Sequence, residues 1–374
     1  MQEGGYKAFI PVSLPPVPPV EHDEEMRLLA SEADRALARL DGICSVLPNP
    51  DLFVEMYLWR EALLSSQIEG TQASLEEVLQ FNAGIGTKGD TRDEREVSNY
   101  VRATRETLAA LRKDGRLTLD LLRAAHGVLM QGTRGGTLSP GEFRRIQNFI
   151  GPPGVALADA LFVPPPPEVV PGAMQELERF ANQEDAVTPL VKAALVHAQF
   201  ETIHPFRDGN GRIGRLFITL FLCMRGVLDR PLLCMSYFLK RRRAEYYDRL
   251  MKVRQNGDWE QWVKFFLGVV AETSRESGST AVEIIGLKER FMRRLLELKM
   301  ATSNAVGLLE LLFREPYVGV PDIVQELNVS RVTASQLLRR FERAGVLREV
   351  TGKQKRRRFE FRDYVAILSR GTEQ

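Results

Sequence analysis

Apolar residues recur every three or four positions along most of this chain, which is the spacing of one buried face of a helix. In the segment 21–47, for example, Met26, Ala33, Leu37 and Leu40 fall on one side. Prolines, glycines and capping residues divide the pattern into separate helices. The clearest of these lie at about 21–47, 51–69, 97–111, 119–130, 188–202, 216–222 and 275–300. The sequence therefore predicts a mainly all-α protein.

One region interrupts the helical pattern. Residues 142–150 and 160–163 flank a turn that contains glycine and proline, which predicts a short β-hairpin. The prolines at 164–167 end the second strand. An isolated hairpin has an unpaired edge, so it could hold an extended peptide by strand addition, or it could simply pack on its own domain.

The pattern changes after residue 303, where short helices are followed by two strands. The helices are expected at Val306–Phe313, Val320–Leu327 and Arg331–Ala344, and the strands at 345–350 and 357–361. This order is typical of a winged helix-turn-helix. Ser330 precedes the third helix and would cap it.

Basic residues are concentrated in this C-terminal region. Residues 331–362 contain eleven Lys or Arg and three acidic residues, a local net charge of +8, whereas the whole chain carries +2. A segregated basic patch on such a fold favours DNA as a partner, with a protein contact as the alternative. The residues predicted to face DNA are Arg331, Thr333, Gln336, Arg339, Lys353, Lys355 and Arg356.

Length and composition set the broad class. With 374 residues, 44% hydrophobic and 27% charged, the chain is expected to form two or three globular domains. Its three cysteines, Cys44, Cys223 and Cys234, have no metal-ligand spacing and are expected to be reduced. The first residues lack a signal-peptide pattern and no apolar run approaches about 18 residues, so we expect a cytoplasmic protein without a membrane span.

The chemistry is concentrated in residues 204–215, with the sequence His-Pro-Phe-Arg-Asp-Gly-Asn-Gly-Arg-Ile-Gly-Arg. An apolar helical run follows, so Gly209, Asn210 and Gly211 should lie where a helix begins. Free N–H groups and the helix dipole favour an anion at such a point, and glycines allow its close approach.

The remaining polar residues of this stretch extend the same chemistry. Arg212 and Arg215, at i and i+3, could each donate two hydrogen bonds to a phosphate group. Asp208 offers an oxygen ligand for Mg²⁺ beside those phosphates, and His204 could accept a proton near neutral pH. The stretch contains no P-loop, and an EF-hand that began at Asp208 would lack its oxygen ligands. The other alternative is an ordinary surface turn before a buried helix.

These residues resemble the signature of the Fic family, His-Pro-Phe-x-Asp/Glu-Gly-Asn-Gly-Arg-x-x-Arg, at every position. The resemblance implies a protein adenylyltransferase that moves AMP from MgATP to a Ser, Thr or Tyr hydroxyl of a target protein. It implies that His204 is the base, that Asp208 holds Mg²⁺, and that residues 209–211 with both arginines bind the phosphates. In the family a hairpin such as 142–163 holds the target segment.

The resemblance extends to further residues. A kinase-like branch of the family has lysine in place of the second glycine, and Gly211 argues against it. Tyr246 and Tyr247 lie in the region that resembles the adenine pocket. Relatives also suggest a homodimer, although no repeat or heptad in the sequence demonstrates one.

A second motif precedes the catalytic stretch. Glu69 lies at the end of a predicted helix, where the helix dipole disfavours a negative charge unless a cation is near. Ser65-x-x-x-Glu69-Gly70 resembles the inhibitory motif of the family, which implies that Glu69 pairs with Arg212 and prevents productive phosphate binding, with Ser65 holding the helix. The alternative is a solvated carboxylate on a surface helix.

We therefore expect an N-terminal helical region with an inhibitory helix at 1–92, a Fic core at 93–272, a connector helix at 273–302 and a winged helix at 303–374. Two other functions stay open. One is a DNA-binding transcriptional regulator whose Fic core only senses nucleotide. The other is removal of AMP from proteins, in which Glu69 positions a water molecule.

Overall fold

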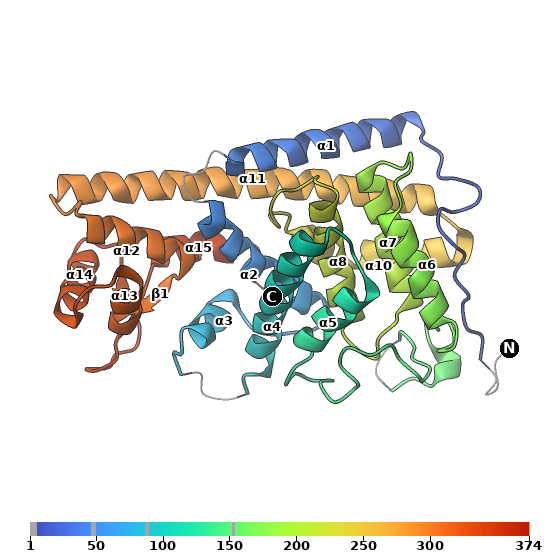
Figure 1. The fold of residues 1–374 in the computed structure, drawn as a ribbon, viewed down its shortest axis with the longest axis horizontal. Helices are drawn as coiled ribbons and strands as arrows, with labels where there is room; N and C mark the ends of the chain where they lie inside the picture. The colour runs from blue at the N-terminus through green and yellow to red at the C-terminus, as the bar shows by residue number, and fades with distance from the viewer. Residues whose placement is uncertain (1–5, 46–49, 87–89, 152–153, 374) are drawn as a thin grey trace.

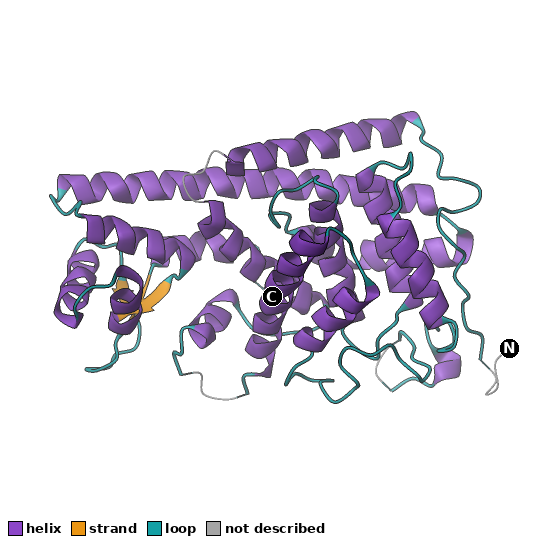
Figure 2. Ribbon diagram, viewed as in Figure 1, coloured by secondary structure: helices purple, strands orange, loops and turns teal. Residues whose placement is uncertain are grey.

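The protein is described here by a computed structural model that covers residues 6–45, 50–86, 90–151 and 154–373. Helices make up most of this elongated molecule, and its small sheet lies at one end (Figure 1, Figure 2). The prediction of a mainly all-α protein is confirmed. The helices before residue 300 are α1 (Glu24–Ser45), α2 (Pro50–Ile68), α3 (Leu75–Asn82), α4 (Arg92–Asp114), α5 (Leu119–Leu129), the short 3-10 helix η1 (Leu157–Asp159), α6 (Val170–Asn182), α7 (Pro189–Ile203), α8 (Asn210–Met224), α9 (Met235–Arg241), α10 (Arg243–Asn256) and α11 (Trp259–Glu297).

Helix α11 joins the two ends of the molecule, and α1 packs along it (Figure 1). Near its start, Trp262 is fully buried and its Nε1 donates to the carbonyl of Ala194 on α7 at 2.9 Å. Near its end, Phe291 packs edge-on against Phe361, with ring centroids 5.3 Å apart. The connector predicted at 275–300 is therefore the second half of one continuous helix.

Helices α7 and α8 form the centre of the fold. Helix α7 is buried on every side from Leu190 to Ile203, and the buried residues include the polar side chains of Lys192, His197 and Glu201. Helices α6, α10 and α11 pack against α7, while α2, α4 and α5 pack against α8. These surrounding helices fix the positions of the loop between α7 and α8 and of the residues it carries.

The hairpin predicted between residues 142 and 163 is wrong in its extent. In the described part of this segment, the pairing consists of one antiparallel bridge between Ile150 and Phe162. The first half is tied elsewhere, because the N–H of Arg144 donates to the carbonyl of Pro205 instead of to a partner strand. On the other side, the N–H of Phe9 donates to the carbonyl of Val163 at 2.9 Å. Part of the predicted turn, residues 152–153, lies outside the described residues.

The C-terminal domain has the three helices expected from the sequence, one further helix at its end that was not predicted, and a sheet with one additional strand. Its elements are α12 (Ser303–Arg314), β1 (Tyr317–Gly319), α13 (Val320–Leu327), α14 (Arg331–Arg343), β2 (Arg348–Glu349), β3 (Arg358–Glu360) and α15 (Arg362–Ser369). The strands form an antiparallel sheet in the order β1-β3-β2, in which Val318 faces Phe359 and Arg348 faces Glu360. Among the described residues, no helix is long and apolar enough to cross a membrane.

Candidate active site

The loop between α7 and α8 has an unusual backbone conformation. His204 ends α7 with left-handed angles (φ 50°, ψ 59°), and its N–H donates to the carbonyl of Phe200 at 2.9 Å. Such angles cost a non-glycine residue roughly 1–2 kcal/mol, and they cluster at functional sites. Gly209, with a φ of 76°, ends the loop and directly precedes α8. A glycine adopts this angle without strain, so α8 can begin immediately after the loop.

Side chains from the segment between α5 and η1 hold the first half of this loop. Arg144 Nε donates to the carbonyl of His204 at 2.9 Å, and its Nη2 donates to the carbonyl of Pro165 at 2.5 Å. Asn148 Nδ2 donates to the carbonyl of Phe206 at 2.9 Å. The segment predicted as a β-hairpin is therefore fixed beside His204 by side-chain hydrogen bonds, in place of a strand ladder.

His126 on α5 holds the second half of the loop. Its Nδ1 accepts the N–H of Gly141 at 2.8 Å, so its proton is on Nε2, which donates to the carbonyl of Asp208 at 3.0 Å. The ring also stacks on Phe206, with centroids 3.8 Å apart and planes 5° from parallel. Burial lowers the pKa of His126 to about 4, which keeps it neutral and preserves both hydrogen bonds near pH 7.

Asn210 was predicted to help cradle phosphates, but its side chain is directed into the loop. Its Oδ1 accepts the N–H of Phe206 and its Nδ2 donates to the carbonyl of the same residue, both at 2.8 Å. The amide is buried, so it braces the loop. Any contact between Asn210 and an anion would come from its main-chain N–H at the start of α8.

The end of α2 brings a carboxylate to the first turn of α8. A Cβ built on Gly211 would run into Oε1 of Glu69 and would lie 3.0 Å from Nη1 of Arg215. The absence of a side chain at position 211 therefore lets Glu69 approach the α8 backbone closely. The positive end of the α8 dipole lies there, and it compensates for the unfavourable position of this carboxylate at the end of α2.

Glu69 pairs with Arg215, and the expected pairing with Arg212 is wrong. Arg215 Nη2 lies 2.7 Å from Glu69 Oε1, and the same guanidinium donates to both the hydroxyl and the carbonyl of Ser65 at 2.8 Å. The Arg215 side chain is 1% exposed and that of Glu69 is 33% exposed. Burial raises the pKa of Glu69, but the charge and hydrogen bond of Arg215 outweigh it, so the pKa lies below its usual range.

Arg212 faces a different helix. Its Nη1 forms a close ion pair with Glu96 on α4, which also accepts a hydrogen bond from the hydroxyl of Thr71 at 3.2 Å. Its Nη2 lies 3.5 Å from Oδ1 of Asp208. The two arginines of the motif are therefore held by two different helices, Arg215 by α2 and Arg212 by α4, with Arg212 close to the carboxylate predicted to bind Mg²⁺.

His204 is half-buried and neutral. Burial and then the charges of Arg254 and Arg144 lower its pKa to about 3. Its Nδ1 has no hydrogen-bond partner among the described residues. A neutral imidazole keeps one unprotonated nitrogen, so His204 has a lone pair with which to accept a proton, and the lowered pKa makes it a weaker base than a free imidazole.

The two tyrosines predicted for an adenine pocket lie in different surroundings. Tyr246 is buried, and its hydroxyl donates to Nε2 of His197 at 2.9 Å, while Nδ1 of His197 donates to the carbonyl of Gly214 at 3.0 Å. Burial lowers the pKa of His197 to about 3, as expected for a structural histidine. Tyr247 is 38% exposed, so its ring remains accessible to a ligand.

Three segments of the chain match known families. Residues 27–109 match the Fic/DOC family N-terminal domain, and residues 116–222 match the Fic/DOC family itself. These two matches together cover just over half of the chain. The chain belongs to the Fic/DOC family. Residues 304–356 match the C-terminal domain of SoFic-like protein adenylyltransferases.

Curated relatives of this Fic protein resemble part of it. A probable protein adenylyltransferase of Aquifex aeolicus is 40% identical over 70 residues, which cover 19% of this chain and 22% of the relative. The protein adenylyltransferase Fic of Drosophila melanogaster is 34% identical over 135 residues, which cover 36% of this chain and 24% of the relative. The chain thus spans less than a quarter of the length of either relative.

Solved structures share the fold more extensively. A Fic family protein from Desulfovibrio desulfuricans G20 covers 95% of this chain, and 98% of its own length, with a TM-score of 0.59 and 23% identity. A Fic domain containing signaling protein from Bacteroides thetaiotaomicron covers 67% of this chain and 96% of its own length, with a TM-score of 0.54 and 19% identity. At these identities the likeness shows the fold alone.

In this Fic protein, Asp208 is suited to a metal that arrives with a ligand. The described ranges contain no group of three or more His, Cys, Asp or Glu residues that could hold a metal ion by themselves. Asp208 Oδ1 accepts the N–H of Gly209 at 2.6 Å, and Oδ2 lies against Gly135, where a Cβ would collide with it. A single oriented carboxylate is enough for Mg²⁺, which usually takes its other ligands from phosphates and water.

The residues predicted to contact DNA lie on the surface of the C-terminal domain. Arg331, Gln336 and Arg339 on α14 are exposed, and so are Lys353, Lys355 and Arg356 in the predicted wing, the loop between β2 and β3. Thr333 is half-buried, and its N–H is capped by Ser330 Oγ at 3.1 Å. The structure thus leaves the basic side chains accessible to a partner.

Four residues that hold the site were not identified from the sequence, namely His126, Arg144, Asn148 and Glu96. Each acts on a loop or helix at least 56 residues away along the chain. The one available signal was His126, a histidine on the last turn of an otherwise apolar helix face. The other three lie in segments whose local pattern gives no indication of their partners.

Proposed function

We propose that this protein transfers AMP from ATP to a Ser, Thr or Tyr hydroxyl of a protein, and that Glu69 holds it in an inhibited state. The observation that carries the proposal is the juxtaposition of two features at the start of α8. A neutral His204 ends α7, and a buried Arg215 with the α8 dipole forms an anion site that Glu69 occupies. The names of the curated relatives support the same reaction.

The chemistry assigns one role to each group. The imidazole of His204 takes the proton of the target hydroxyl as its oxygen attacks the α-phosphorus of ATP. The bond between the hydroxyl oxygen and the α-phosphorus forms as the opposite bond breaks, the one from the α-phosphorus to the bridging oxygen of the β-phosphate. Pyrophosphate leaves with the electron pair of that bond. The N–H groups of Asn210 and Gly211, together with the side chains of Arg212 and Arg215, stabilise the phosphates. Mg²⁺ that enters with ATP would be held by Asp208 and would neutralise phosphate charge.

Inhibition follows from competition for one guanidinium. The carboxylate of Glu69 accepts from Arg215 and lies against Gly211, where a phosphate oxygen would otherwise bind. Both groups are anionic, so they cannot share the site without strong repulsion. An ATP molecule that binds beside an intact Glu69 would therefore place its phosphates unproductively. A Glu69 carboxylate that positions water would instead favour AMP removal, which is the second reaction open to this site.

The decisive experiment compares wild type, Glu69→Gly and Glu69→Gly/His204→Ala, each with Mg²⁺ and ATP labelled at the α- or the γ-phosphate. We expect protein labelling from α-labelled ATP only, strongest in Glu69→Gly and absent in the double variant. Label from the γ-phosphate would indicate a kinase. No label in any variant would contradict the proposed transfer and would favour a nucleotide-sensing role.

The exposed basic residues of α14 and the wing support a second candidate function, DNA binding by the C-terminal domain. Binding through phosphates would weaken steeply with salt, because each contact releases a counterion. Replacement of Lys353 and Lys355 by Ser should reduce affinity and the salt slope together. Affinity for DNA that did not respond to either change would contradict this function and would favour a protein partner.

A further inference from the structure

The segment that follows α15 lies on helix α2, which carries Ser65 at its end. In Figure 1 the chain leaves the C-terminal domain and returns to the centre of the molecule. Arg60 Nη2 on α2 donates to the carbonyl of Arg370 at 3.0 Å. Gly371 packs against the ring of Tyr237 on α9, so closely that a Cβ would collide with the ring. Thr372 is buried in this contact.

Gln67 connects this segment to the last turn of α2. Its Nε2 donates to the carbonyls of Ala73 at 3.1 Å and Thr372 at 3.0 Å, and its Oε1 accepts from Lys240 at 2.8 Å. Lys240 also donates to the carbonyl of Glu373 at 2.6 Å. All the hydrogen-bonding groups of this buried amide are therefore engaged, with partners on three separate segments.

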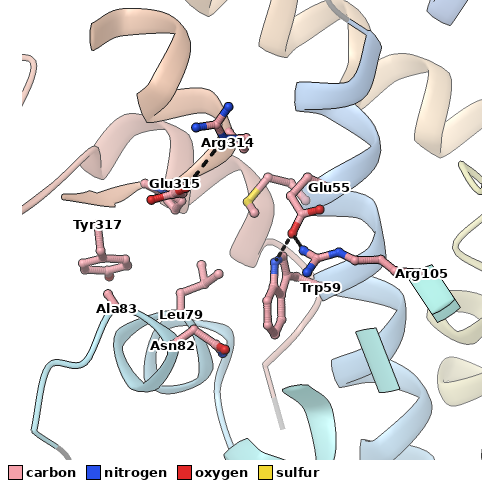
Figure 3. Close-up of a pocket in the computed structure, with 11 residues that line it drawn as sticks. Glu55, Trp59, Leu79, Asn82, Ala83, Arg105, Arg314, Glu315 and Tyr317 are labelled. Atoms are coloured by element: carbon pink, nitrogen blue, oxygen red, sulfur yellow. Dashed lines mark hydrogen bonds and ion pairs between the residues drawn. The ribbon is translucent and has the colours of Figure 1, made fainter. Parts of the chain in front are cut away.

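The rest of the contact between α2 and the C-terminal domain is more open. Helix α12 packs directly on α2, and a cavity of about 540 Å³ that is lined by α2, α3, α4, α12 and β1 also lies between the two parts (Figure 3). On one wall, Glu55 pairs with Arg105 and accepts from Trp59, and on the other wall Arg314 pairs with Glu315. Among the described residues that line the cavity, no ion pair crosses from one wall to the other. The segment after α15 thus supplies direct polar links from the C-terminal domain to α2.

Gln67 also stands at the start of the turn that presents Glu69. The N–H of Gly70 donates to the carbonyl of Gln67 at 3.1 Å, and the N–H groups of Glu69 and Thr71 both donate to the carbonyl of Ser66. Glu69 is therefore held between two fixed points, its ion pair with Arg215 on α8 and the hydrogen-bonded Gln67. A shift of Gln67 would move the carboxylate relative to the guanidinium.

We propose that residues 370–373 form a clamp on α2, with Gln67 as a positioning residue that keeps Glu69 on Arg215. The proposal rests on the inhibitory role of Glu69 proposed above. It gives the C-terminal domain a route to the active site, because α15 packs against α2, α3 and α11 and leads directly into the clamp. A partner that displaced α15 would lift the clamp and release Glu69.

Gly371→Val tests the clamp in the full-length protein. Its Cβ would run into Tyr237, and its φ of 71° is unfavourable for a β-branched residue, so the segment should leave α2. Gly352→Val is the matched control, since Gly352 has a φ of 59° and no atom within 4 Å of a built Cβ. Lys240→Met is a second test that removes one link without backbone strain. Lys252→Met is its control, on α10 and paired with Asp248.

Hydrogen exchange and AMP transfer are measured on all four variants without a partner. We expect amides of residues 65–72 to exchange about tenfold faster in Gly371→Val and Lys240→Met than in their controls, the factor that one or two lost hydrogen bonds give. Transfer from α-labelled ATP should rise by a similar factor and stay below that of Glu69→Gly. Unchanged exchange would overturn the clamp, as would unchanged transfer while Glu69→Gly is active. If Glu69→Gly itself proves inactive, the proposed function fails and exchange alone decides the clamp.

Discussion

Replacement of His126 should loosen the catalytic loop, although no part of the proposed reaction involves this residue directly. His126→Ala removes an acceptor from the N–H of Gly141 and a donor from the carbonyl of Asp208. It also removes the ring that stacks on Phe206 at 3.8 Å. His126→Phe keeps a ring in the same place and loses only the hydrogen bonds. The pair of variants therefore separates the two contributions.

The magnitudes follow from the number of groups left without a partner. Each buried polar group that loses its hydrogen bond costs about 1–3 kcal/mol, so two such groups cost about 2–6 kcal/mol. Loss of the stacked ring adds about 0.5–1.5 kcal/mol. We expect His126→Phe to lower the free energy of unfolding by about 3 kcal/mol and His126→Ala by about 4 kcal/mol. The exposed His22 offers a control, and His22→Ala should change it by less than about 0.5 kcal/mol.

Urea denaturation monitored by circular dichroism gives the free energies, and transfer from α-labelled ATP in a Glu69→Gly background gives the activity. Because the carbonyl of Asp208 lies at the start of the proposed nucleotide cradle, kcat/KM for ATP should fall about tenfold in both His126 variants, equal to about 1.4 kcal/mol. A His126→Phe variant that matched wild type in both stability and activity would refute this prediction. That result would mean that the two hydrogen bonds do not hold the loop.

Two further predictions concern groups around Arg215. Ser65→Ala removes one of the hydrogen-bond acceptors of Arg215 and leaves Glu69 in place. The rate of AMP transfer should therefore rise about two- to fivefold, which is less than in Glu69→Gly. Equal rates of transfer for Ser65→Ala and wild type would contradict this prediction. Burial raises the pKa of Glu201 to about 7 from its ordinary value of 4.5. The folded state therefore holds this proton more tightly than the unfolded state, and the stability that it contributes is fully present below pH 4.5 and is lost as pH rises through 7. Between pH 5 and pH 8, wild type should therefore lose about 2 kcal/mol more stability than Glu201→Gln in urea denaturation, and parallel curves would show that Glu201 is not desolvated.

The central features of the site could be predicted because they are encoded locally. Residues 204–215 contain a helix end, a turn and a helix start in one stretch, so their spacing alone places His204 near the cradle. Ser65 and Glu69 lie one helical turn apart, and the structure brings both to the same arginine. Helical periodicity likewise predicted most of the long helices, since each buries one apolar face.

The features that the sequence did not predict depend on how helices are oriented relative to one another. Arg212 and Arg215 are three residues apart and have the same side-chain chemistry, so nothing local decides which of them meets Glu69. The rotation of α8 decides it, because it directs Arg215 to α2 and Arg212 to Glu96 on α4. The hairpin failed for a similar reason, since Arg144 uses its hydrogen bonds on the catalytic loop.

The pairing of each arginine with its own N-terminal helix has a consequence for nucleotide binding under the proposed function. Arg215 is almost fully buried, and a buried guanidinium that loses its carboxylate is costly unless another anion takes its place. Release of α2 should therefore be easiest when a phosphate is available to replace Glu69. Because binding couplings are reciprocal, the factor by which ATP favours release of α2 from Arg215 equals the factor by which that release strengthens ATP binding. Under the proposed function Glu69 and ATP are two ligands of one guanidinium, and calorimetric titration of wild type and of Glu69→Gly with ATP would measure their competition as the difference in ATP affinity.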